Sequence, residues 1–178
     1  LRLHSDTRQE VLRKVTDLEV DLGLIPGPER GEQFEFHGLF RYERVLITPR
    51  GHPLLKTPLT SIEQIARWPL ILMGQRTATR TMLEAEFQRK GVSYEIIVEL
   101  DSMDVIKRYV AEGMGISVGP QLSLEPGDED HLEVLSLAAL MPMEQAGIVT
   151  LQGKSMSIPA QNFIALFKET MARGSTSA

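Results

Sequence analysis

The stretch DSMDVIKRYVAEGMGISVGP, residues 101–120, is the part of the chain from which the architecture can be worked out most directly. Its apolar residues recur at i, i+1, i+4 and i+5, as on one face of a helix: Val105, Ile106, Tyr109 and Val110. We expect this face to be buried, with Lys107, Arg108 and Glu112 on the opposite face.

Both ends of this predicted helix carry local signals. Asp101 or Ser102 can accept hydrogen bonds from the free N–H groups of the first turn. Gly113 can adopt the left-handed conformation that ends a helix without a Cβ clash. Ile116 and Val118 then indicate a short strand. The stretch therefore predicts a helix that packs on a sheet, with a polar loop before its first turn.

The glycines of the same stretch allow a second interpretation, as a dinucleotide-binding loop. Gly113, Gly115 and Gly119 together look like such a glycine-rich loop. That motif requires its glycines after a strand and before a helix, so that the helix N-terminus faces a pyrophosphate. Here the order is reversed, because the glycines follow a helix and precede a strand. This order favours a structural role for the three glycines.

Strands and helices alternate in both directions from this stretch. Short apolar runs predict strands at 20–25, 43–48, 70–73, 94–100, 132–137 and 147–151. Helices are expected after Thr7 or Asp6, at 80–90 before Gly91, and from Pro159. Residues 1–3 alternate like a strand edge, so that 1–25 would form a strand-helix-strand unit with a parallel, right-handed crossover.

Composition narrows the class of protein. The 178 residues suffice for one large domain or two small lobes, and 42% hydrophobic residues support a packed core. The absence of cysteine excludes disulfides, cysteine zinc sites and thiol nucleophiles. A net charge of −5 argues against nucleic-acid binding by this segment itself. The chain opens without Met and inside a predicted strand, so we expect it to be a segment of a longer protein.

No arrangement of reactive side chains predicts an enzyme. The histidines His4, His37, His52 and His131 lack the spacing of metal ligands. No G-x-S-x-G elbow is present, and Glu84 and Glu86 do not face each other at i and i+2 of a helix. We therefore predict no catalytic residue, no metal site and no cofactor.

Two polar loops between a strand end and a helix start form the candidate binding site. Thr77 and Thr79, with Arg76 and Arg80 beside them, precede the helix at 80–90. Asp101 and Ser102 occupy the equivalent loop before the next helix. Free N–H groups, hydroxyls and helix dipoles would suit an anion there.

Two observations leave alternatives open at this site. Thr79 and Ser102 could serve only as helix caps, which is the common use of Ser and Thr before helices. Asp101 would repel an anion unless it turned away or met a cationic group on the ligand.

Four ordered stretches resemble a known family. They are VDLGL (20–24), VLI through GHPL (45–54), SIEQIARWPL (61–70), and DVIKRYV with GMGI (104–116). Together they resemble the effector-binding domain of LysR-type transcriptional regulators, and the last stretch is most similar to the CysB-like branch. The winged helix-turn-helix and the first strand of the family's domain are expected upstream. Leu18 stands where the family usually has Gly, so that this helix should end differently.

The resemblance implies an α/β domain of the type 2 periplasmic-binding-protein-like fold, with two Rossmann-like lobes joined by two crossover segments. Lobe I would comprise residues 1–49 and 134–178, and lobe II residues 50–133. A small polar or anionic effector would bind in the inter-lobe cleft, in contact with residues of the two loops: Arg76, Thr77, Thr79, Asp101 and Ser102.

The resemblance also implies partners. The domain would form a homodimer, often within a tetramer, in the cytoplasm, and would reach DNA only through the absent N-terminal domain. Effector binding would control DNA binding and transcription. The alternative is a periplasmic-type solute-binding protein of a transporter, which has the same fold.

Overall fold

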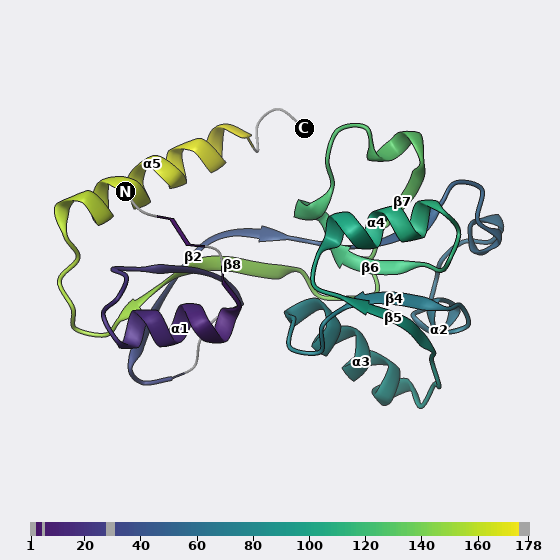
Figure 1. Ribbon diagram of the computed structural model, residues 1–178, viewed down its shortest axis with the longest axis horizontal. Coiled ribbons are helices and arrows are strands. Elements are labelled where there is room, and N and C mark those ends of the chain that lie inside the picture. Colours follow the sequence, from purple (N-terminus) through teal and green to yellow (C-terminus); the bar gives the residue numbers. More distant parts are fainter. Residues whose placement is uncertain (1–2, 5, 28–30, 175–178) are drawn as a thin grey trace. The chain divides into compact units, whose positions relative to one another are not determined.

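The computed structural model describes residues 3–4, 6–27 and 31–174, with side chains up to residue 170 (Figure 1). The helices are α1 (Arg8–Thr16), α2 (Glu63–Ala66), α3 (Ala78–Lys90), α4 (Met103–Ala111) and α5 (Ile158–Gly174), and the short 3-10 turns are η1 (Pro53–Lys56), η2 (Gln121–Ser123) and η3 (Asp128–Asp130). The strands are β1 (Gly23–Pro26), β2 (Phe34–Tyr42), β3 (Arg44–Pro49), β4 (Leu70–Met73), β5 (Ile96–Leu100), β6 (Ser117–Pro120), β7 (Leu132–Ser136) and β8 (Glu144–Leu151). None of the described helices is long and apolar enough to cross a membrane.

The chain divides into two compact units and passes between them twice. The first unit comprises Leu1–Arg41 and Glu144–Ala178, and the second comprises Tyr42–Met143. This division differs from the boundaries expected from the sequence, which assigned β3 and residues 134–136 of β7 to the first lobe. In the structure β3 pairs with both β6 and β7, so these strands belong with the second unit.

The first unit contains the sheet β1-β8-β2. Helix α1 places Val15 against Ile25 of β1 and Val149 of β8, and all three side chains are buried. The predicted parallel partner of β1 falls on residues 1–3, of which 1–2 lie outside the described residues; the partner that the structure shows for β1 is β8, and it is antiparallel.

Strand β2 was not predicted, since the sequence indicated a loop before residue 43. Phe34 and Phe36 pack against the core of the first unit, with the exposed Glu35 between them, but this alternation does not continue along the strand. The strand lacks a continuous apolar run, and its partner β8 lies about a hundred residues later in the chain. Such a strand is stabilised by its distant partner and not by its local sequence.

The second unit is built on five strands in the order β5-β4-β6-β3-β7. Strands β4 and β5 pair in parallel, whereas β3 pairs antiparallel with β6 and β7. A parallel bridge between Leu70 and Ile116 joins the two groups, with hydrogen bonds from Ile71 N to Ile116 O and from Ile116 N to Pro69 O, both 2.9 Å.

Helices cover both faces of this sheet. In β3, Leu46 belongs to the core formed with α2 and α3, while Val45 and Ile47 belong to the core formed with α4. The alternation follows from the two-residue period of a strand. A strand buried on both faces requires an almost continuous apolar run. For this reason the strands at 43–48 and 70–73 were correctly predicted.

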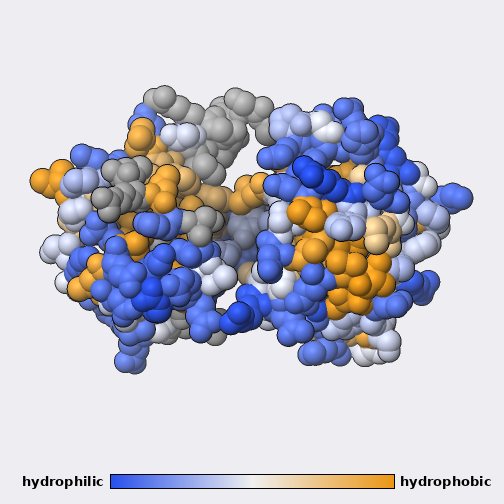
Figure 2. All heavy atoms as spheres, in the orientation of Figure 1, coloured by the Kyte–Doolittle hydropathy of each residue, from blue (hydrophilic) through white to orange (hydrophobic). Residues whose placement is uncertain are grey.

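The buried face of α4 differs from the predicted one. Ile106 and Val110 are fully buried, as expected, but Val105 and Tyr109 are 37% and 39% exposed. Figure 2 shows an apolar patch among hydrophilic residues on the surface of the second unit. Lys107, predicted on the outer face, is only 5% exposed and joins Ile106 and Val110 on the inner side.

The end of α1 corrects a second prediction. Leu18 has φ +60°, and its N–H donates to Val15 O while Glu19 N–H donates to Lys14 O. This is the Schellman arrangement, the same closure that Gly91 gives α3 and Gly113 gives α4. The expectation that the helix would end differently without Gly was wrong, because Leu18 adopts the left-handed conformation itself.

The strain at Leu18 can be measured. Leu18→Gly should raise the free energy of unfolding by about 0.5–1 kcal/mol, since relief of Cβ strain exceeds the entropy cost of glycine. Gly91→Ala is the matched control, because its φ is +64° and an added Cβ meets nothing within 4 Å. Gly91→Ala should lower the free energy of unfolding by about 1 kcal/mol. Urea denaturation measures the free energy of unfolding of both variants. A change in the same direction for both would contradict the strain assigned to Leu18.

Gly115 permits the approach of β6 to β4. A Cβ on this residue would lie 2.6 Å from Pro69 O and 3.3 Å from Ile71 Cγ1. Gly115→Ala should therefore lower the free energy of unfolding by about 1–3 kcal/mol. Hydrogen exchange should show faster loss of the Ile71 and Ile116 amide protons. Wild-type protection at these two amides would show that the bridge does not need glycine.

Candidate functional site

The candidate site lies where β4 and β5 end. The two strands are parallel, and Met73 is paired with Leu100, so that the loops that follow them emerge at the same edge of the sheet. A Cβ built on Gly74 would lie 3.3 Å from Asp101 Oδ1 and 3.9 Å from Glu99 Oε1. The structure therefore brings the two predicted loops together.

The order of the strands makes this edge a topological switch point of the sheet. The chain runs from β4 through α3 to its neighbour β5, and then through α4 past β4 to β6. The two connections thus proceed in opposite directions, and their helices lie on opposite faces of the sheet. Ligands of open α/β sheets bind outside the strand ends at such a switch point.

Thr77 closes the first loop. It occupies the N-cap position of α3, but its hydroxyl donates to Gly74 O at 2.9 Å and makes no capping bond to the helix. Thr79 lies in the first turn of α3 and is half-buried. The alternative that Thr79 caps this helix is therefore wrong, because Thr77 holds the cap position.

Ser102 occupies the N-cap position of α4 with an extended backbone, φ −131° and ψ 124°. Its side chain makes no capping hydrogen bond. The first backbone bonds of the two helices are Thr81 N to Thr77 O and Ile106 N to Ser102 O, which leaves the N–H groups of each first turn without a helical partner. Two helix ends thus present donors at one edge of the sheet.

The charged members of the site differ in exposure. Arg76 and Asp101 are exposed, while Thr77, Thr79 and Ser102 are half-buried. Within the described part of the chain, the side chain of Asp101 has no hydrogen-bond or ion-pair partner. Its carboxylate is therefore placed to contact a ligand that approaches the loops.

Arg80 has a structural role that its sequence position did not indicate. Only 4% of it is exposed, and its Nη1 donates to Met73 O at 3.1 Å and to Glu99 Oε2 at 3.4 Å. Its Nε lies 2.8 Å from Glu84 Oε1, without the alignment of a hydrogen bond. The guanidinium thus ties the end of β4 to β5 beneath the site.

Two residues of this edge were missed from the sequence. Gly74 is where Asp101 approaches the first loop, and Glu99 adds a second carboxylate. Alternation in β5 was the available signal, because it turns Glu99 outward between two partly buried residues. Among the described residues, no group of three His, Asp or Glu side chains could hold a metal ion.

Comparisons with known proteins agree with this architecture. The LysR substrate binding domain family matches residues 1–172. The HTH-type transcriptional regulator cbl of Escherichia coli is 32% identical over 133 residues, which cover 74% of this chain and 42% of that regulator. The chain therefore spans less than half the length of this relative.

Solved structures show the same fold. The cofactor-binding domain of the Cbl transcriptional regulator superposes with a TM-score of 0.82 and 28% identity, over 97% of this chain and 78% of that one. The Synechocystis CcmR regulatory domain, in complex with 2-PG, gives a TM-score of 0.76 at 24% identity, over 90% and 78% of the two chains.

These matches confirm the α/β, type 2 periplasmic-binding-protein-like fold and the likeness to the Cbl and CysB regulators. The family match covers both units and nearly the whole chain. The chain belongs to the LysR substrate binding domain family.

Proposed function

We propose that this chain is the ligand-sensing domain of a LysR-type transcriptional regulator and that a small polar or anionic effector binds at the ends of β4 and β5. The observation that carries the proposal is the pair of adjacent helix N-termini whose cap residues, Thr77 and Ser102, make no side-chain capping bond. Residues of both loops would contact the effector: Arg76, Thr77, Thr79, Asp101 and Ser102.

The chemistry of the edge supports a ligand with an anionic group. Unpaired N–H groups and the positive ends of the α3 and α4 dipoles favour negative charge. The hydroxyls of Thr79 and Ser102 can donate to it. Asp101 and Glu99 oppose a second negative charge nearby, and they favour a ligand that also carries a donor or a cationic group.

The regulatory role follows from the relatives, which are HTH-type transcriptional regulators of greater length. In the longer protein, the effector would control DNA binding by a winged helix-turn-helix domain outside this chain. The domain would act as a homodimer within a tetramer in the cytoplasm. Catalysis has no part in this proposal.

Binding at the two loops can be tested by thermal shift with sulfate, thiosulfate, methanesulfonate, the amino acids and benzoate. A compound at 100 times its dissociation constant should add about 2.7 kcal/mol to the stability. Ser102→Ala should weaken the best compound about tenfold, because a hydrogen bond to a charged group is lost. Ser93→Ala, an exposed serine before the start of β5, should bind as the wild type does. The site is wrong if no compound in the panel binds, or if Ser102→Ala binds equally well.

Asp101 allows an independent test of charge at the site. Asp101→Asn should strengthen sulfate binding about three- to tenfold at low ionic strength, since one like charge is removed. The gain should shrink with added sodium chloride, because exposed charges are screened. Isothermal titration calorimetry measures both effects. Glu112→Gln, which removes an exposed carboxylate at the far end of α4, is the matched control. An equal gain in both variants would show that net charge alone is responsible.

A further inference from the structure

A cavity lies in the second unit, between α4 and residues 125–132. Its volume is about 240 Å³, and both polar and apolar side chains line it. Ala111 and Leu132 supply the apolar wall. None of the residues proposed to contact the effector lines this cavity. It is thus separate from the ends of β4 and β5.

A partly buried ion pair forms the floor of the cavity. Lys107 Nζ donates to Asp128 Oδ2 and to Ser123 O, both at 2.8 Å, and Asp128 Oδ2 also accepts from Glu125 N at 2.8 Å. Burial alone would lower the pKa of Lys107, but the hydrogen bond and charge of Asp128 outweigh it, so that this pKa is raised. Lys107 and Asp128 neutralise each other and hold the segment after β6 against α4.

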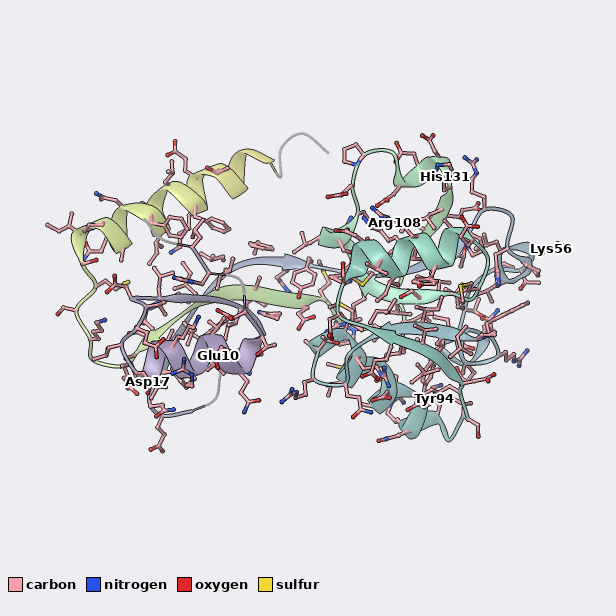
Figure 3. All side chains as sticks on the ribbon, viewed as in Figure 1. Glu10, Asp17, Lys56, Tyr94, Arg108 and His131 are labelled. Carbon is pink, nitrogen blue, oxygen red and sulfur yellow. The ribbon has the colours of Figure 1, made fainter. Side chains whose placement is uncertain are left out.

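Groups of both signs surround this floor. Arg108 lies on α4, and His131 is the residue before β7 (Figure 3). Within the described residues, neither side chain has a hydrogen-bond or ion-pair partner. Asp104 and Glu125 also line the cavity, and their side chains are 66% and 72% exposed. They lie 3.4 and 3.9 Å from Lys107 Nζ, whose shorter bonds go to Asp128 and Ser123.

We propose that this cavity is a second small-molecule site, for a zwitterionic amino acid with an aliphatic side chain. The Arg108 guanidinium and a His131 ring N–H would hold the carboxylate, as forked donors do. Asp104 and Glu125 would hold the ammonium group, and Ala111 and Leu132 would contact the side chain.

Charge balance selects this class of ligand over simpler ions. With Lys107 and Asp128 paired, the cavity presents two carboxylates and one guanidinium, with His131 beside it. A simple anion would meet Asp104 and Glu125, and a simple cation would leave Arg108 unpaired. A molecule that carries both signs satisfies each group. The volume is below that of sites for drug-sized ligands, which suits a molecule of amino-acid size.

An amide chemical-shift titration of the chain with L-leucine tests the proposal. Shifts should centre on residues 104–111 and 125–132 and saturate at millimolar concentration. Two analogues separate the charges: 4-methylpentanoate lacks the ammonium group, and 3-methylbutylamine lacks the carboxylate. Each should bind at least about tenfold more weakly than leucine, since one set of charged hydrogen bonds is lost.

Single substitutions test which side chains of the cavity contact leucine. Arg108→Gln and Glu125→Gln should each weaken leucine binding about tenfold. Lys56→Gln is the matched control, because Lys56 is an exposed cation of the same unit, away from the cavity (Figure 3), and it should leave binding unchanged. Absence of saturation by about 10 mM overturns the proposal. So does equal affinity for either analogue, or shifts centred on residues 74–79 and 101–103, which would place leucine at the effector site.

Discussion

The approach of β6 to β4 is the constraint on which the second unit depends. Within the described residues, β4 and β5 form one ladder and β3, β6 and β7 another, and the backbone bonds around Ile71 and Ile116 join them. Pro69 O lies where a side chain of residue 115 would be, so that the junction requires glycine. Because the sheet is continuous across this junction, α2 and α3 can cover one face and α4 the other.

The same junction determines where the two loops of the candidate site lie. β4 lies between β5 and β6, both parallel to it, and the chain visits β5 first and β6 second. Right-handed crossovers in opposite directions place α3 and α4 on opposite faces. Both helices must then begin at the carboxyl ends of β4 and β5, and the two loops that precede them meet there. The site is thus a consequence of strand order, with Arg80 beneath it to hold the strand ends together.

Elements that depend on neighbouring residues were predicted correctly from the sequence. Features that depend on residues far away in the chain were not. The apolar runs of β3 and β4 indicate strands buried on both faces, and the loops after β4 and β5 lie where the sequence predicted them. The set of α4 residues that are buried could not be predicted in the same way. Lys107 can be buried because Asp128 and Ser123, which come later in the chain, satisfy its charge and donors. Strand β2 similarly depends on β8.

For the candidate site, the sequence indicated residue types but not their hydrogen bonds. A threonine or serine before a helix usually caps it, and the capping bond satisfies one of the free N–H groups of the first turn. In the structure the Thr77 hydroxyl bonds to Gly74 O, and the Ser102 side chain makes no capping bond. Helix ends that their own cap residues leave unsatisfied must be satisfied by water or by a ligand. The first turns of α3 and α4 therefore present free N–H donors at the candidate site.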